Sequence, residues 1–338
     1  MSVKMGSGSL QYELVEGWEQ LPAGYRHADV AGVCTDSSSN VYLFCRGDHP
    51  VMIYDREGKF LDSWGEPGSG PGQFSYRTHG IHMAKGDQLF LVDDSNHKVG
   101  KYSLDGQELF QCGPADHPSD TGGYDGRNAA TVTRAGGPFN RPTNLSVAPD
   151  GDLFVSDGYG NTRIHRFDAS GHLCNSFGEP GSGPGQFRVP HSVWVHTDGR
   201  IFVCDRENDR IQIFSPQGEY LTEWHDVQRP QDIFIDKDER VYVGELVWRA
   251  GMRSFRRGPI ENEEPARMSI FDINGNCLLR WGSGVGPDAA APGQFVAPHG
   301  IWVDDRGDIY MAEVTDTIGV RPGIVPEGTH TFQKFARI

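Results

Sequence analysis

The sequence predicts an all-β fold, a six-bladed β-propeller that spans residues 1–338 as a single domain. The first observation behind this prediction is a unit of four short apolar strands that recurs along the chain. The strands are separated by polar turns of the Asp-Gly, Ser-Gly, Gln-Gly or Asn-Gly type. Such segments are typical of antiparallel hairpins, and four strands in roughly 40 residues is the pattern of a propeller blade. Two stacked β-sandwiches would not explain so uniform a period.

The second observation is an anchor pair in the first strand of each unit, in which an apolar residue follows a small or polar one. The six pairs are Gly32-Val33, Gly80-Ile81, Asn144-Leu145, Ser192-Val193, Asp232-Ile233 and Gly300-Ile301. Two inserts, around residues 112–138 and 247–266, lengthen the spacing. We expect the ring to close by pairing a strand near residues 11–15 with one near 332–338, because closure removes exposed sheet edges. Residues 1–10 are expected to be disordered or derived from a tag.

The composition of the chain limits which classes of binding partner we expect. The net charge is −15, with 46 acidic against 31 basic residues. Nucleic acids and anionic membranes are bound by basic surfaces, so we expect neither as a partner and favour a small-molecule substrate. No run approaches the ~20 apolar residues of a membrane-spanning helix. Six cysteines without C-x-x-C spacing, and no apolar leader segment, predict free thiols and a cytoplasmic protein.

Histidine occupies the residue before the anchor pair in every second unit. We call this residue the axial position, because first-strand residues line the central channel of a propeller. From the first unit to the sixth it is Ala31, His79, Thr143, His191, Gln231 and His299. Alternate blades of a six-bladed ring lie about 120° apart, so three imidazoles should converge. A lone histidine there is more often a hydrogen-bonded channel residue, but the alternation favours a three-histidine metal site. Zn²⁺ fits best, and Fe²⁺, Co²⁺ or Mn²⁺ accept the same ligands.

A second set of polar side chains follows the second strand of three units. Arg46 and Arg206 belong to the first and fourth repeats, which lie opposite each other in a six-bladed ring. They could hold a substrate carboxylate by forked hydrogen bonds. The Tyr159 phenol can donate or accept a proton, or ionise beside a metal. The alternative is a packed tyrosine and two surface salt bridges, for example with Asp48 and Glu207. The aspartates that end the second strands are expected to cap turns; these are Asp93, Asp157 and Asp205.

The repeat resembles the NHL repeat, and its motifs resemble one family in particular. These motifs are RGDH at 46–49, HGI at 79–81, RPTNLSV at 141–147, VSDGYGNTRI at 155–164, PGQFRVPHSV at 184–193, DRENDRIQ at 205–212 and PHGI at 298–301. They are similar to those of peptidyl-alpha-hydroxyglycine alpha-amidating lyases. The resemblance implies a reaction in which the N–C bond of an α-hydroxyglycine breaks to give an amide and glyoxylate.

The resemblance also implies residue roles. His79, His191 and His299 would bind zinc, Tyr159 would be the catalytic base, and Arg46 and Arg206 would bind and polarise the substrate. The family's calcium site matches the main-chain carbonyls of Val33 and Ile81 and needs an aspartate after the third histidine. Gly300 stands there, so we predict no calcium at that position. Ala297 stands where the family has a methionine. The expected substrate is a small carboxylate-bearing metabolite rather than a secretory peptide.

Two other functions remain open from the residues alone. The same three histidines could activate water for the hydrolysis of a lactone, an ester or an amide. A propeller can also act as a non-catalytic platform that binds proteins. The three alternating histidines argue against the platform.

Overall fold

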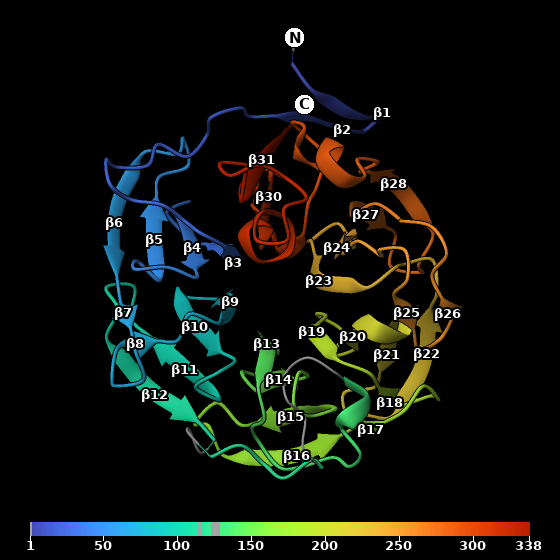
Figure 1. The fold of residues 1–338 in the computed structure, drawn as a ribbon. Helices are drawn as coiled ribbons and strands as arrows, with labels where there is room; N and C mark the ends of the chain where they lie inside the picture. Colours follow the sequence, from blue (N-terminus) through green and yellow to red (C-terminus); the bar gives the residue numbers. More distant parts are fainter. Residues whose placement is uncertain (1, 114–116, 123–128) are drawn as a thin grey trace. The chain divides into compact units, whose positions relative to one another are not determined.

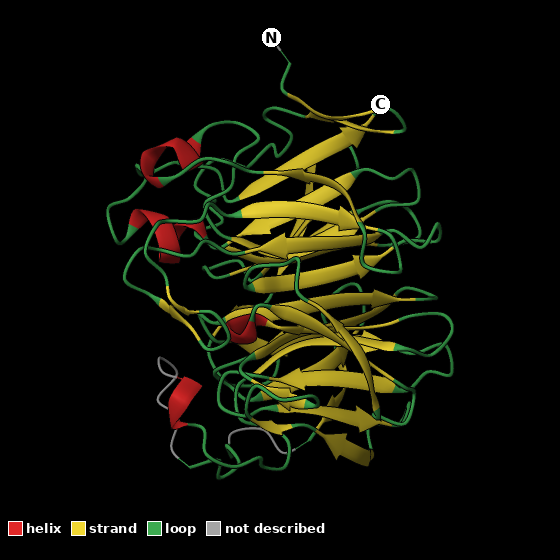
Figure 2. Cartoon of the chain, turned by 90° about the vertical axis from the view of Figure 1, so that its right-hand side faces the viewer, coloured by secondary structure: helices red, strands yellow, loops and turns green. Residues whose placement is uncertain are grey.

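A computed structural model describes residues 2–113, 117–122 and 129–338 of the chain. Its regular structure is almost entirely antiparallel strands, with a few short helical turns (Figure 2). Six sheets of four or five strands are the blades, so the prediction of a six-bladed β-propeller is confirmed (Figure 1). Every anchor pair lies in the first strand of its blade. Part of the first insert, residues 114–116 and 123–128, lies outside the described residues.

The chain divides into two compact units of three blades each. One unit, which we call unit A, comprises Gly68–Pro230 and Arg253–Pro259. Blade 2 is β9 (Thr78–Ala84), β10 (Gln88–Asp93), β11 (Lys98–Tyr102) and β12 (Glu108–Cys112). Blade 3 is β13 (Pro142–Val147), β14 (Leu153–Asp157), β15 (Arg163–Phe167) and β16 (Leu173–Phe177). Blade 4 is β19 (Pro190–Val195), β20 (Ile201–Asp205), β21 (Arg210–Phe214) and β22 (Tyr220–Trp224).

The other unit, unit B, comprises the N-terminal segment up to Pro67, Gln231–Met252 and Ile260–Ile338. Blade 1 is β3 (Val30–Thr35), β4 (Val41–Cys45), β5 (Val51–Tyr54) and β6 (Phe60–Trp64). Blade 5 is β23 (Pro230–Ile235), β24 (Val241–Glu245), β27 (Arg267–Phe271) and β28 (Cys277–Trp281). Blade 6 is β29 (Pro298–Val303), β30 (Ile309–Glu313), β31 (Phe332–Arg337), β2 (Leu10–Leu14) and β1 (Lys4–Ser7).

The remaining elements are short. They are the strands β7 (Glu66–Pro67), β8 (Gln73–Phe74), β17 (Glu179–Pro180), β18 (Gln186–Phe187), β25 (Arg253–Ser254) and β26 (Gly258–Pro259), and the helical turns η1 (Ala129–Thr131), η2 (Arg206–Asn208), η3 (Gly286–Ala290) and η4 (Asp316–Val320). Among the described residues, no helix has the length and apolar character needed to span a bilayer.

Blade 6 is built from both ends of the chain. β2 pairs with β31 in antiparallel register, with Tyr12 opposite Arg337 and Leu14 opposite Phe335. The pairing predicted for residues 11–15 and 332–338 is therefore confirmed. Residues 4–7 form β1, which pairs with β2 and buries Met5. The expectation that residues 1–10 are disordered or derived from a tag stays a prediction.

Apolar side chains of neighbouring blades pack face to face. In unit A one core cluster joins blades 2 and 3 through Phe90, Val92, Leu145, Val155 and Phe167. Burial of these side chains stabilises the fold by about 25 cal/mol per Å² of apolar area removed from water. The first strands are thereby held on rigid supports, which a site built from axial residues requires. Within the described residues none of the six cysteines forms a disulfide, so the predicted thiols are confirmed.

Candidate metal centre

A repeated main-chain hydrogen bond places a polar side chain beside the axial position in most blades. The main-chain N–H of a residue one or two positions after the second strand donates a hydrogen bond. Its acceptor is the carbonyl oxygen of the residue two positions before the axial residue of the same blade. The bonds are Arg46 to Asp29 (2.9 Å), Asp94 to Arg77 (3.3 Å), Tyr159 to Arg141 (3.2 Å), Arg206 to Val189 (3.1 Å) and Val314 to Ala297 (3.0 Å). Arg46, Tyr159 and Arg206 thus hold equivalent places, each next to the start of its own blade's first strand.

Within unit A, Tyr159 lies between two axial histidines. Its hydroxyl oxygen is 3.2 Å from His79 Nε2 and 3.0 Å from His191 Nε2. The two imidazole rings have centroids 4.7 Å apart, and both side chains are buried. Blade 3 therefore places a phenol at the point where the histidines of blades 2 and 4 approach each other.

Main-chain carbonyl groups orient two of the axial imidazoles. His79 Nδ1 lies 2.5 Å from the Thr143 oxygen, and His299 Nδ1 lies 2.6 Å from the Ala31 oxygen. A carbonyl oxygen can only accept, so Nδ1 carries a proton, and in the neutral imidazole Nε2 is then the nitrogen with the lone pair. Histidines that bind a metal through one ring nitrogen usually donate a hydrogen bond from the other, and this bond fixes the orientation of the ring.

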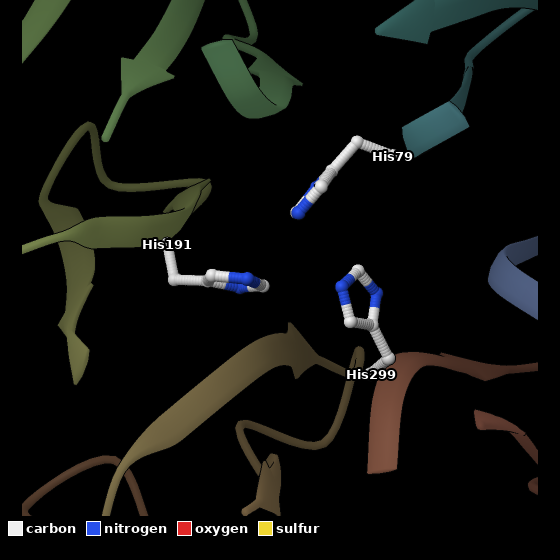
Figure 3. Close-up of side chains that lie close together, drawn as sticks. All are labelled: His79, His191 and His299. Carbon is white, nitrogen blue, oxygen red and sulfur yellow. The ribbon is translucent and has the colours of Figure 1, made fainter. Parts of the chain in front are cut away.

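His79, His191 and His299 form one group of candidate metal ligands. One ring nitrogen from each lies within 4.8 Å of the others, and all three side chains are buried (Figure 3). His79 and His191 belong to unit A, and His299 belongs to unit B. Neutral imidazoles suit Zn²⁺ and related divalent ions, and three of them leave a position for water or substrate. The donor set therefore fits the metal site that the alternating histidines predict.

Arg206 extends the site beyond the histidines. Its Nη1 is 3.2 Å from the Tyr159 hydroxyl oxygen, and its Cζ is 5.2 Å from the tyrosine ring centroid. Glu207 holds this guanidinium, because Glu207 Oε1 accepts from Arg206 Nε and from Arg229 Nη2, each at 2.7 Å. Burial would raise the pKa of Glu207, but Arg229 and Arg206 outweigh it and lower that pKa to about 2. The carboxylate is therefore charged at neutral pH.

Replacing Glu207 by glutamine is expected to lower stability in a pH-dependent way. The folded-state pKa lies below the unfolded value of ~4.3, so this carboxylate stabilises the fold fully above that value. The contribution is lost as the pH falls toward the folded pKa of about 2. Breaking a buried ion pair costs about 3 kcal/mol at neutral pH. Urea unfolding between pH 7 and pH 3 should show the difference between wild type and Glu207→Gln shrinking. A constant difference would contradict this role.

Arg46 lies in unit B and is buried. Its Nη1 is 3.8 Å from Asp29 Oδ2, whereas the salt-bridge alternative named Asp48 as an example of its partner. That alternative is correct for Arg206 in naming Glu207 as its partner. Neither ion pair is a surface pair, because the four side chains are at most 11% exposed. The role of Arg46 toward a substrate stays a prediction.

The aspartates at the ends of the second strands cap turns, as predicted. Each accepts a main-chain N–H from the segment that leads into the first strand of its blade. The bonds are Ser75 to Asp93 (2.6 Å), Asn140 to Asp157 (3.0 Å) and Arg188 to Asp205 (2.7 Å). Asparagine side chains three or four residues further on, Asn96, Asn161 and Asn208, donate to the same carboxylates.

The second insert contributes a hairpin that contacts the Arg206 turn. Ser254 Oγ donates to Asp209 Oδ2 at 2.5 Å, and Arg257 Nε donates to the same oxygen at 3.0 Å. The Phe255 N–H donates to the Glu207 carbonyl oxygen at 3.2 Å. Arg253–Pro259 thus supports the turn that carries Arg206, a role that the sequence did not suggest.

Two residues near Tyr159 were missed from the sequence. Arg77 Cζ lies 5.5 Å from the Tyr159 ring centroid, and Asp94 binds the Arg77 guanidinium. Asp94 occupies the place in blade 2 that Tyr159 and Arg206 occupy in blades 3 and 4. Extending the comparison of repeats to this position could have found it.

Main-chain atoms close to Gly300 leave no room at this position for the aspartate that the resemblance requires for a calcium site. A Cβ atom at residue 300 would lie 2.6 Å from Gly32 Cα and 2.9 Å from the Ala31 oxygen. Both are main-chain atoms of the neighbouring strand, which cannot move aside like a flexible side chain. We expect a calcium-selective chelator to leave the melting temperature unchanged. Calcium found by elemental analysis together with a lower melting temperature after chelation would contradict this.

Comparisons with known proteins agree with this architecture. A family model described as a 6-bladed beta-propeller matches residues 33–120, and one described as an NHL repeat matches residues 187–214. The chain is a six-bladed propeller of the NHL-repeat type. Among solved structures, the propeller is similar to a gluconolactonase from Xanthomonas campestris (12% identity, 99% and 97% of the two chains, TM-score 0.60). It is also similar to a virginiamycin B lyase from Staphylococcus aureus (14%, 94% and 98%, TM-score 0.56). At these identities the similarity shows the fold alone.

Curated relatives confirm the resemblance to amidating lyases. The propeller is 27% identical to a peptidylglycine alpha-amidating monooxygenase of Rattus norvegicus, over 89% of this chain and 32% of the relative. It is 31% identical to monooxygenase B of Xenopus laevis, over 84% and 32%. It is 33% identical to a probable peptidyl-alpha-hydroxyglycine alpha-amidating lyase of Caenorhabditis elegans, over 49% and 43%. The chain thus spans about a third of the length of the two monooxygenases.

Proposed function

We propose that the propeller is a metal-dependent lyase that cleaves the N–C bond of a small N-acyl-α-hydroxyglycine to an amide and glyoxylate. The observation that carries the proposal is the Tyr159 hydroxyl, which has two histidine nitrogens and Arg206 Nη1 within 3.2 Å. Such a phenol is within hydrogen-bond reach of a group bound beside the histidines. Relatives named as alpha-hydroxyglycine alpha-amidating lyases support the reaction class.

The proposal assigns the metal to His79, His191 and His299, with Zn²⁺ as the ion and Fe²⁺, Co²⁺ or Mn²⁺ as alternatives. A divalent ion bound there supplies Lewis-acid chemistry, which makes a nearby hydroxyl group more acidic. The Nδ1–H bonds to Thr143 and Ala31 orient two of the rings so that Nε2 is the nitrogen left to bind a metal.

Tyr159 is proposed to accept the proton of the substrate hydroxyl. The electron pair left on that oxygen forms the carbonyl of glyoxylate as the C–N bond breaks. The nitrogen leaves with the bonding pair and takes up a proton, which completes the amide. Arg206 and Arg46 are proposed to hold the substrate carboxylate, and Arg206 is also placed to stabilise negative charge at the Tyr159 oxygen.

The reaction consumes no water, and this separates it from the hydrolase alternative. Metal-loaded protein is incubated with N-acetyl-α-hydroxyglycine in ¹⁸O-labelled water, and products are followed by mass spectrometry. We expect acetamide and glyoxylate in equal amounts, with no label in the acetamide. Turnover of lactones or esters with solvent oxygen in the acid product, and no glyoxylate, would contradict the lyase. Absence of turnover with both substrate classes would favour a binding propeller.

Replacing Arg206 by lysine should both raise KM and lower kcat. A lysine keeps the charge but cannot donate to Glu207 and Tyr159 at once through a planar fork. Charge-assisted hydrogen bonds are worth about 1.5–3 kcal/mol, so kcat/KM should fall about 10- to 100-fold. The control is Arg200→Lys, a more exposed arginine of blade 4 that pairs with Asp198. Equal kinetics for Arg206→Lys and the control would contradict the assignment.

A further inference from the structure

Arg77 is a second arginine beside Tyr159. It lies two residues before His79, and its Cζ is 5.5 Å from the Tyr159 ring centroid, comparable to the 5.2 Å of Arg206. Arg77 belongs to blade 2 and Arg206 to blade 4, the blades on either side of the one that carries Tyr159. All three residues belong to unit A. Guanidinium groups at such distances from a tyrosine ring are attracted to its face.

Asp94 fixes the guanidinium of Arg77. Asp94 Oδ2 accepts from Arg77 Nε at 3.1 Å and from Nη2 at 2.8 Å, and the carboxylate is fully buried. The other oxygen, Oδ1, accepts from Ser95 Oγ at 2.7 Å and lies 3.4 Å from Arg141 Nη2. The Arg77 side chain nevertheless stays 35% exposed. Arg77 is thus held in place while part of its guanidinium faces solvent.

The charges around Tyr159 follow the same pattern on both sides. Asp94 is shared by Arg77 and Arg141, and Glu207 is shared by Arg206 and Arg229. Arg77 and Arg206 are therefore each held by a buried carboxylate that a second arginine also contacts. An arginine needed only to neutralise Asp94 would be redundant with Arg141. Two guanidinium groups oriented in this way beside Tyr159 can bind an anion by charge-assisted hydrogen bonds.

We propose that Arg77 is a further substrate-binding residue, which together with Arg206 binds the carboxylate of the substrate next to the Tyr159 hydroxyl. The inference rests on the proposed function and restricts its substrates to small anions. Asp94 has already oriented the Arg77 guanidinium, so little side-chain entropy is lost on binding. An uncharged analogue of the same size should therefore bind much more weakly than the carboxylate.

The test is equilibrium binding of glycolate, an α-hydroxy carboxylate that lacks the nitrogen leaving group, measured by titration calorimetry on the metal-loaded protein. Arg77→Gln should weaken glycolate binding about tenfold or more, the usual scale for a lost charge-assisted hydrogen bond. Arg77→Lys should restore part of the affinity, and glycolamide should bind wild type and Arg77→Gln alike. The matched control is Arg166→Gln. Arg166 is 28% exposed, pairs with Asp152, and lies 5.6 Å from the ring centroid of Phe154.

The outcomes separate this inference from the lyase proposal. Glycolate affinity that is equal in wild type and Arg77→Gln overturns the role of Arg77, even if glyoxylate is formed from N-acetyl-α-hydroxyglycine. No measurable glycolate binding to the wild type overturns it as well. Arg77-dependent glycolate binding without glyoxylate formation supports the anion site and contradicts the lyase. Thermal unfolding of each variant verifies that the fold is retained.

Discussion

Phenylalanine in place of Tyr159 is expected to leave the fold and the metal content intact and to lower turnover by about 10²–10⁴-fold. The change removes one oxygen atom, the one that lies within 3.2 Å of His79 Nε2, His191 Nε2 and Arg206 Nη1. The ring remains, so its contacts with the histidine rings and with the two guanidinium groups are kept. The measurement is kcat for glyoxylate release, together with metal content and melting temperature.

The control for this change is Tyr102→Phe, which removes a buried hydroxyl from β11 in the same unit. It should keep full turnover. Full activity in Tyr159→Phe would remove the tyrosine from the mechanism. A loss of metal from Tyr159→Phe would show instead that the phenol serves the metal site and not the proton transfer.

Alanine at His79, His191 or His299 is expected to remove most bound metal and to abolish turnover. Two imidazoles and water bind a divalent ion far more weakly than three imidazoles. Metal per chain, measured by elemental analysis of protein purified without added metal, should fall from about one to near zero. The same elemental analysis of the wild-type protein would also identify the ion.

His82→Ala is the matched control for metal binding. His82 lies on β9, the strand of His79, and is also buried, where burial lowers its pKa to about 4. Its ring contacts that of Trp194, and the group of candidate metal ligands consists of His79, His191 and His299. Metal retained at one per chain after all three histidines are replaced would contradict the proposed site.

Most of the fold could be predicted because it is repetitive. One anchor pair per blade marks the first strand six times, so an error in one repeat is corrected by the others. The closure of blade 6 was predicted because pairing the two terminal segments removes exposed sheet edges. The strand β1 at residues 4–7 was not predicted, because Met5 supplies only one apolar side chain, too weak a pattern to indicate a strand.

The site could be predicted only where it follows the repeat. His79, His191, His299, Tyr159 and Arg206 sit at recurring positions, and comparison of the repeats finds them. Asp94 also occupies such a position, but from the sequence alone an aspartate there is interpreted as a turn cap. Only the structure shows that it binds the Arg77 guanidinium. The hairpin Arg253–Pro259 belongs to an insert with no counterpart in other blades. Its contacts to the Arg206 turn depend on residues more than 40 positions away, so no local pattern reports them.

Blade 6 combines strands from the two ends of the chain, and this affects the order in which the protein can fold during synthesis. β31 lies between β2 and β30, so the β1–β2 pair cannot join the sheet of blade 6 until β31 has been synthesised. The blade that is completed last is also the one that carries His299. A nascent chain therefore has two of its candidate ligands long before the third is held in a finished sheet. We expect metal loading to follow synthesis, and chains that end before β31 to expose open sheet edges and become targets for proteases.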